Sequence, residues 1–240
     1  MRVKATISYD GGKFKGFQRQ KSTKKTISTQ IETGLKSLGI FQQIRGSGRT
    51  DAGVHATGQV IDFEVPAYWK DLTKLQIALN QKLHYVSIKK LEWVDDTFHS
   101  RFSAKKRLYR YVFKTSIPSV FEQDYIAYYP PFDEKLLQKS LKVFEGEHDF
   151  SNFIKTGSIT HTNIRVIYKA DYKKYKHYHI IYFEANGFLR SQVRMMVAGA
   201  MQVAQDKWTI EALQKQLNLT VKSKSKLAPP EGLYLAKIIY

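Results

Sequence analysis

The chain has 240 residues, of which 42% are hydrophobic and 13% aromatic, and it contains no cysteine. This composition predicts a buried core in one large domain or two small ones, and it excludes disulfides, cysteine-ligated metals and thiol catalysis. Lys and Arg number 39 against 21 Asp and Glu, a net charge of +18. Both halves of the chain share this excess, so we expect a polyanionic partner, with nucleic acid the first candidate. The alternative is a soluble basic protein that has no such partner.

Hydropathy and the N-terminal sequence indicate where the protein works. There is no run of eighteen apolar residues, so no membrane-spanning helix is expected. Asp10 precedes any apolar segment, so no secretory signal is expected either. Together with the absence of cysteine, this pattern favours a cytoplasmic protein.

Hydrophobic periodicity predicts six elements in the first half. Alternation predicts a strand over residues 2–9. Thr29 and Glu32 have the spacing of a capping box, which predicts the start of a helix that Gly39 ends. The remaining elements of this half are expected at 41–45 (strand), 59–65 (strand), 71–83 (helix) and 86–94 (strand).

The second half repeats this order of elements. They are expected at 107–115 (strand), 133–144 (helix), 163–171 and 177–185 (strands), 188–205 (helix), 209–217 (short helix) and, after a Lys/Ser/Pro loop, 233–240 (strand). The order β-α-β-β-α-β is that of the ferredoxin-like, split βαβ motif. We therefore predict an α+β fold with an N-terminal half at 1–104 and a C-terminal half at 105–240. The two halves are expected to join into one mostly antiparallel central sheet with helices on one side.

Residues 46–59 are the densest candidate for chemistry. Four glycines in this stretch predict tight turns, and Arg49, Thr50, Asp51 and His55 supply polar groups. A turn between glycines can hold the Asp51 carboxylate rigidly, and Arg49 favours its charged form. On spacing alone the plainer interpretation, an aspartate that only forms a turn, is the more common one.

Two further stretches combine aromatic and basic residues. Tyr109, Tyr111 and Phe113 alternate along a predicted strand, either as a row facing the core or with one ring available to stack on a base. Arg190 and Arg194 are spaced to share one face of the helix over 188–205, either as a solvated basic face or as a phosphate clamp.

The familiar hydrolase and metal motifs are missing from the sequence. It contains neither HExxH nor GxSxG, and His177 and His179 have no third ligand nearby. We therefore expect no bound metal.

Five segments in order resemble the tRNA pseudouridine synthase A family over nearly the whole chain: YDGGKFKGFQRQ, GSGRTDAGVHATGQV, FHSRFSAKKRLYRYVF, NGFLRSQVRMMV and PPEGLYLAKI. GRTDAGVHA is the most specific of them. The resemblance implies two ferredoxin-like halves around a central active-site cleft, no cofactor and a homodimer. It also implies isomerisation of uridine to pseudouridine at positions 38, 39 and 40 of the tRNA anticodon stem-loop.

The resemblance also assigns roles to individual residues. Asp51 matches the family's catalytic aspartate, and Arg49 matches the arginine that pairs with it and helps to displace the base. Tyr109 matches the tyrosine that stacks on the target uracil, and Arg194 matches an arginine near the active site. The sequence departs from the family pattern at three packing positions: Phe17 replaces a common Trp, Ser28 a common Val and Ala198 a usual Gly.

The implied reaction suits the residues that are present. It breaks the N1–C1′ bond and joins C5 to C1′ without redox chemistry, so missing cysteines are no obstacle. Asp51 either attacks C1′ or removes a C2′ proton, and both routes stay open. The basic stretches 13–25 and 105–107 are expected to contact the RNA backbone. The competing hypothesis is a non-catalytic RNA-binding protein or RNA chaperone.

Overall fold

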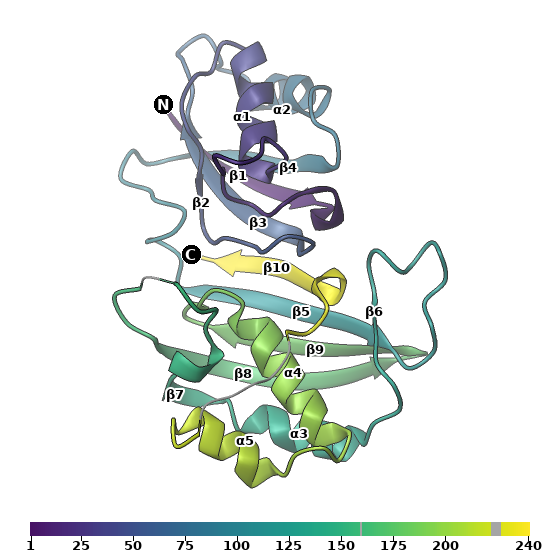
Figure 1. Cartoon of the computed structure of the whole chain (residues 1–240). Coiled ribbons are helices and arrows are strands. Elements are labelled where there is room, and N and C mark those ends of the chain that lie inside the picture. Colours follow the sequence, from purple (N-terminus) through teal and green to yellow (C-terminus); the bar gives the residue numbers. More distant parts are fainter. Residues whose placement is uncertain (159, 222–226) are drawn as a thin grey trace. The chain divides into compact units, whose positions relative to one another are not determined.

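The computed structural model describes residues 1–158, 160–221 and 227–240 and divides into two compact units. The first unit comprises Met1–Lys105 together with Tyr234–Tyr240, and the second comprises Lys106–Leu233. Both combine helices with strands, which confirms the α+β class (Figure 1). The lysine-rich part of the loop expected before the last strand, residues 222–226, lies outside the described residues.

The first unit has a mostly antiparallel sheet with the strand order β4-β1-β3-β10. β1 is antiparallel to both β3 and β4, whereas β10 runs parallel to β3 at His55 and Ala56. The short β2 also pairs with β3. The elements of this unit are β1 (Arg2–Tyr9), the 3-10 turn η1 (Gly11–Lys13), α1 (Ile27–Ser37), β2 (Arg45–Gly46), β3 (His55–Glu64), α2 (Leu72–Asn80), β4 (Val86–Val94) and β10 (Leu233–Ile239).

Alternating apolar residues of β1 form the centre of this unit's core, as the sequence predicted. Val3, Ala5 and Ile7 are fully buried. The helices α1 and α2 contribute further buried side chains, among them Leu35 and Leu79. The sequence between residues 2 and 94 thus builds the β-α-β-β-α-β order expected for this half.

Helix α1 begins earlier than the predicted capping box. Its N-cap is Thr26, whose hydroxyl accepts a hydrogen bond from the Thr29 amide at 3.3 Å. Glu32 has a different role: its carboxylate binds Arg19 at 2.9 Å and accepts the Ile44 amide at 3.1 Å. The Glu32 carboxylate therefore pairs with Arg19 and does not cap the start of the helix, as a capping box would require.

The two central strands of this unit also differ from their predicted positions. Residues 41–44 are not a strand, and β2 consists of Arg45–Gly46 alone. β3 begins at His55 and not at residue 59. Its early residues are sheet because β1 and β10 supply pairing partners for them, which local alternation cannot show.

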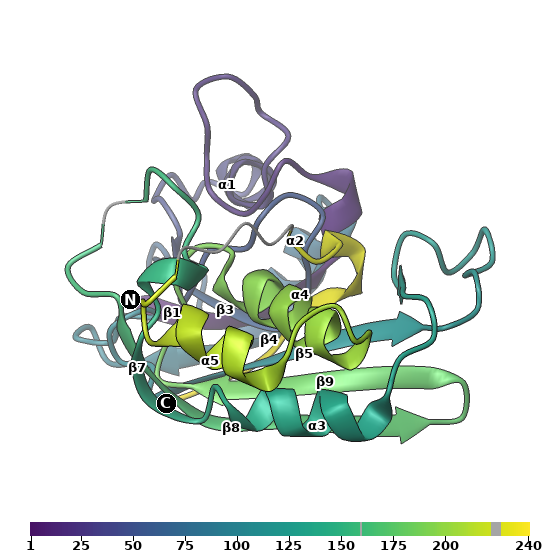
Figure 2. The same ribbon diagram turned by 60° about the horizontal axis from the view of Figure 1, so that its bottom comes forward.

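The second unit has an antiparallel sheet with the order β5-β9-β8-β7, and the short β6 pairs parallel with β5. Helices α3, α4 and α5 cover one face of this sheet (Figure 2). The elements are β5 (Lys106–Lys114), β6 (Ala127–Tyr128), α3 (Glu134–Lys142), β7 (Gly146–Asp149), the 3-10 turn η2 (Ser151–Phe153), β8 (Ile164–Tyr175), β9 (Tyr178–Ala185), α4 (Gln192–Ala204), α5 (Ile210–Leu217) and the 3-10 turn η3 (Pro230–Gly232). The sequence did not predict β6 and β7, which are two and four residues long.

Helix α4 starts four residues later than predicted. Ser191 precedes it with φ +61°, a left-handed conformation that helix residues do not adopt. Gln192 fixes this entry, because its side-chain oxygen accepts the Leu189 amide at 2.7 Å. Arg190 therefore precedes the helix, and the expected face shared with Arg194 does not form.

The buried side of α4 packs closely on its neighbours. Ala198, one of the departures from the family pattern, is buried there.

None of the helices in the described ranges has the length and apolar character needed to cross a membrane.

Candidate active site

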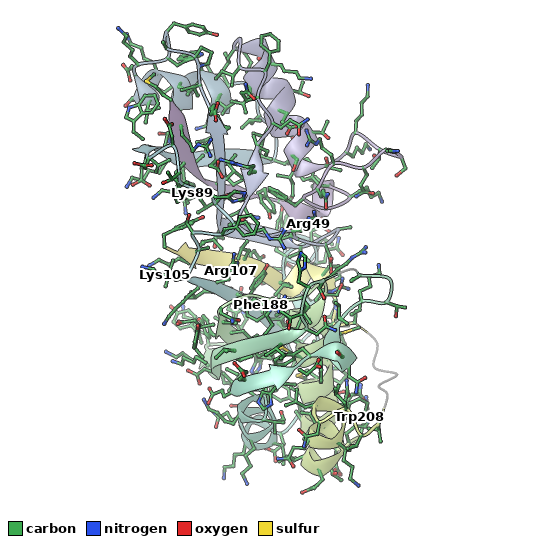
Figure 3. The ribbon with its side chains drawn as sticks, turned by 90° about the vertical axis from the view of Figure 1, so that its left-hand side faces the viewer. Arg49, Lys89, Lys105, Arg107, Phe188 and Trp208 are labelled. Atoms are coloured by element: carbon green, nitrogen blue, oxygen red, sulfur yellow. The ribbon has the colours of Figure 1, made fainter. Side chains whose placement is uncertain are left out.

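Asp51 begins a tight turn in the loop between β2 and β3. The Val54 amide donates to the Asp51 carbonyl at 3.2 Å, so residues 51–54 form a closed turn. Gly53 occupies the third position with φ +79°, as a type II turn requires. The Asp51 side chain is half-buried, and the neighbouring Arg49 is exposed and labelled in Figure 3.

Buried contacts fix the backbone just before this turn. The hydroxyls of Thr50 and Tyr9 lie 2.9 Å apart, and both residues are buried. The Phe17 amide donates to the Thr50 carbonyl at 3.1 Å. Gly16, with φ +106°, lies so close to this segment that an added Cβ would be 3.1 Å from the Thr50 carbonyl oxygen. The loop at 14–17 thus supports the turn that holds Asp51.

Two of the departures from the family pattern meet in this support. Phe17 is buried, and its ring centroid lies 6.3 Å from that of Tyr9. The Ser28 hydroxyl donates to the Phe17 carbonyl at 2.7 Å. These residues position the backbone beside the turn, in agreement with their interpretation as packing positions.

The first part of the loop is held by Gln59, a fully buried side chain on β3. Its oxygen accepts the Ser47 hydroxyl at 2.5 Å, and its nitrogen donates to the Gly48 carbonyl at 2.9 Å. A buried amide that satisfies both of its ends fixes a loop more firmly than an apolar contact does. The glycine-rich loop is therefore anchored on both sides of Arg49.

His55 closes the motif and is almost completely buried. Its ring stacks on Tyr234 of β10 with a centroid distance of 4.8 Å. Its Nδ1 accepts the Gly11 amide at 3.1 Å and lies 3.4 Å from an Asp10 carboxylate oxygen. These contacts tie the motif to η1 and to the C-terminal strand of the same unit.

Asp62 is a second carboxylate of this unit, and it has no exposed surface. Arg45 Nε donates to it at 2.8 Å, the Ser100 amide donates at 2.9 Å, and Arg2 Nη1 lies 3.5 Å away. Two guanidinium groups and an amide thus surround this carboxylate, which indicates a structural role.

Tyr109 lies on β5 in the second unit. All three aromatic residues of the row on this strand, Tyr109, Tyr111 and Phe113, are buried. Tyr109 is the most accessible of them at 9% exposure, and Phe188 packs edge-on against its ring at 5.1 Å. Phe188 is labelled in Figure 3. A ring fixed by a T-shaped neighbour keeps a defined orientation.

Arg194 lies in the first turns of α4 in the same unit. Its Nε donates to the Ala228 carbonyl at 2.7 Å, and its own carbonyl accepts the Ala228 amide at 3.2 Å. Burial raises the pKa of Tyr129 to about 12, and the nearby Arg194 charge acts in the opposite direction. Arg194 is thus anchored to the segment just before β10.

The two basic stretches expected to contact the RNA backbone differ in how many of their charged side chains bind other protein groups. At 105–107, Lys106 pairs with Glu184 at 2.6 Å, which raises the lysine pKa, and Arg107 donates to the Asn186 carbonyl. In the loop at 13–25, Phe14 and Phe17 are buried while the lysines are exposed. The described residues contain no group of three His, Asp or Glu side chains that could hold a metal ion.

Sequence reasoning missed several supporting residues. Tyr9, Gly16 and Gln59 hold the loop from other elements, and Phe188 holds Tyr109. All four lie in family-like segments: Tyr9 and Gly16 in YDGGKFKGFQRQ, Gln59 in GSGRTDAGVHATGQV and Phe188 in NGFLRSQVRMMV. Those segments were the signal that could have found them.

The chain is an α+β protein with a rigidly held aspartate, buried aromatic rows and a net charge of +18. These features suit an enzyme that acts on a polyanion. Residues 5–103 and 141–240 match the family described as tRNA pseudouridine synthase. The chain belongs to the tRNA pseudouridine synthase family, whose members are isomerases.

Relatives named tRNA pseudouridine synthase A match the chain over its length. That of Helicobacter hepaticus is 40% identical over 99% of this chain and 98% of the relative. That of Campylobacter jejuni strain RM1221 is 39% identical over the full length of both. A chain in the crystal structure of a Cbf5-Nop10-Gar1 complex has 10% identity and a TM-score of 0.37, over 83% of this chain and 45% of that chain, a likeness too weak to carry an argument.

Proposed function

We propose that the protein isomerises uridine to pseudouridine in the anticodon stem-loop of tRNA, at positions 38, 39 and 40, with Asp51 as the catalytic carboxylate. The observation that carries the proposal is the GRTDAGVHA loop, whose aspartate begins a turn braced from β1, β3 and the loop at 14–17. Full-length relatives with the name tRNA pseudouridine synthase A support it.

The proposed reaction conserves atoms and electrons. The N1–C1′ bond breaks, the uracil turns, and a C5–C1′ bond forms; C5 loses a proton and N1 gains one. The Asp51 carboxylate either attacks C1′ or takes the C2′ proton, and each route needs the charged carboxylate at a fixed place. The closed turn and its buried supports provide that fixed place.

The second unit supplies the proposed binding groups. Tyr109 stacks on the uracil and keeps it from leaving while it turns, with Phe188 holding the ring. Arg194, anchored through Ala228, binds the RNA beside the target, and Arg49 helps to displace the base. The proposed catalytic carboxylate and the proposed stacking ring thus come from different units of the chain.

We further propose that the protein acts as a homodimer in the cytoplasm and needs no cofactor. The dimer follows from the family resemblance, and the cytoplasm follows from a cysteine-free sequence that acts on tRNA.

The test is tritium release from C5-labelled uridine in an unmodified tRNA transcript. The wild type should release tritium, and Asp51→Asn should release it at least about 10³-fold more slowly, because the reacting carboxylate is gone. Asp96→Asn, which changes an exposed aspartate of the same unit, should behave as wild type.

The competing RNA-binding function predicts another outcome. Tight, salt-sensitive tRNA binding with no tritium release from any transcript would replace the isomerase by a non-catalytic RNA-binding protein. Loss of folding and binding together in Asp51→Asn would instead mean that this aspartate only forms the turn.

A further inference from the structure

An open cleft lies on the first unit, and part of its lining comes from the basic loop at 13–25. Its volume is about 470 Å³, within the range of about 300–1,000 Å³ for small-ligand sites. One wall comes from η1 and the chain after it, and the other from the turn before β4. The residues that line the cleft are Gly12, Lys13, Phe14, Lys15, Lys25 and Tyr85.

Tyr85 presents an aromatic ring to this cleft. The residue is 61% exposed, and no hydrogen bond holds its hydroxyl within the part of the chain that the structure describes. Its φ is +63°, a conformation that is unfavourable for an aromatic residue and that glycine or asparagine adopts more easily. The Asp10 amide donates to the Tyr85 carbonyl at 2.9 Å, which fixes this turn. Neither burial nor backbone preference explains a tyrosine at this position.

The opposite wall gathers positive charge. The Lys15 amide donates to the Lys25 carbonyl at 2.8 Å, and the Gln20 side chain donates to the Lys15 carbonyl at 2.7 Å. These bonds bring two distant parts of the basic loop together, so Lys13, Lys15 and Lys25 line the same space. Asp10, the carboxylate beside η1, is engaged by the Gly12 amide at 2.9 Å.

We propose that this cleft is an accessory site for an unpaired nucleotide of the RNA substrate, with the base stacked on Tyr85 and its phosphates bound by the three lysines. An exposed aromatic ring next to a cationic groove is the combination that binds single-stranded nucleic acid without regard to sequence. A base offers this ring a flat face to stack on, which the Asp and Glu side chains of an acidic peptide do not. The assignment of the RNA as tRNA rests on the proposed function.

The experiment compares fluorescence anisotropy titrations of a labelled, unmodified tRNA transcript. Tyr85→Asn keeps a residue that tolerates positive φ and should weaken binding about tenfold, the loss expected for one base–aromatic stack. Tyr85→Trp, which keeps the stack, should bind like wild type. Tyr175→Asn is the matched control, because Tyr175 is 63% exposed beside Lys176 on the second unit, and it should leave affinity unchanged.

The lysines have their own readout. Each lysine that contacts a phosphate contributes about one to the slope of log affinity against log salt. Lys15→Ala combined with Lys25→Ala should therefore reduce that slope by about two.

Specific results would overturn this site. Tyr85→Asn binding as tightly as wild type would remove it, and so would weaker binding together with a lower unfolding temperature. If Tyr85→Asn weakened the binding of free uridine monophosphate as much as that of tRNA, the cleft would be a mononucleotide site and not an RNA site. The tritium assay separates the two proposals. If tRNA binding depends on Tyr85 but no tritium is released, the accessory site is supported and the isomerase is not. If tritium is released and Tyr85→Asn binds tRNA like wild type, the isomerase is supported and the accessory site is not.

Discussion

At the scale of single residues, Asp62 shows how much one carboxylate can hold together. It is the acceptor for groups from β1, β2 and the segment at 98–100. Because it has no contact with water, each of these bonds operates in a low dielectric. Removing the negative charge would leave the Arg45 and Arg2 guanidinium groups without their common counter-ion.

We expect Asp62→Asn to lower the free energy of unfolding by about 3 kcal/mol, the cost of breaking a buried ion pair. Glu64→Gln is the control, because Glu64 also pairs with Arg2 but is half exposed, and it should cost less than about 1 kcal/mol. Urea unfolding followed by circular dichroism measures both. Equal effects of the two substitutions would show that burial does not set the strength of this pair.

The contrast between Asp51 and Asp62 shows what the sequence could predict. The turn at Asp51 depends on nearby glycines, so local spacing was enough to find it. The strand expected at 59–65 contained no local sign of the partners of Asp62. Its cover comes from Ser100 and Arg2, 38 and 60 residues away, and such pairings leave no local pattern.

At the scale of elements, the loop between β5 and β6 is organised around Glu122. Its carboxylate accepts the Ser119 amide and hydroxyl, the Lys114 ammonium and the Tyr178 hydroxyl. These bonds, the Ser119 amide first among them, lower the pKa of the Glu122 carboxyl to about 2. The loop projects from the second unit (Figures 1 and 2) and exposes three large apolar side chains, those of Ile117, Val120 and Phe121.

This pKa shift gives stability a direction with pH. A carboxyl whose folded pKa lies below its ordinary value of 4.5 stabilises the fold above pH 4.5, and that contribution is lost as the pH falls toward 2. Glu122→Gln should therefore unfold more easily than wild type at pH 7, and the difference should shrink below pH 4.5. Thermal unfolding across this range measures it, with Gln123→Ala in the same loop as the control. A difference that does not change with pH would contradict the role of the charge.

The helices and strands were predicted where their cause is local. α2, α3 and α5 begin at Asp71, Asp133 and Thr209, whose side chains cap the first turn, and the predicted ranges are close to the observed ones. α1 starts earlier, at the Thr26 cap, and Glu32 binds Arg19 instead of closing a capping box. α4 starts later, after the left-handed Ser191, where Gln192 binds the Leu189 amide.

At the scale of the whole molecule, mass is the simplest test of the proposed assembly. The chain mass is 27.8 kDa, so a homodimer should scatter light as a particle of about twice that mass. The measurement belongs at the protein concentration of the tritium assay and at two salt concentrations, because a charge of +18 per chain opposes self-association most at low salt. A single 27.8 kDa species under both conditions would contradict the dimer.

The return of β10 to the first unit has a consequence for biosynthesis. The first unit receives its last strand only after the 128 residues of the second have been made. At about 5–20 residues per second, the ribosome leaves the His55–Ala56 end of β3 without its β10 neighbour for roughly 6–25 seconds. During that interval Tyr234 is not yet stacked on His55, so the GRTDAGVHA loop gains this contact only after the second unit has been made.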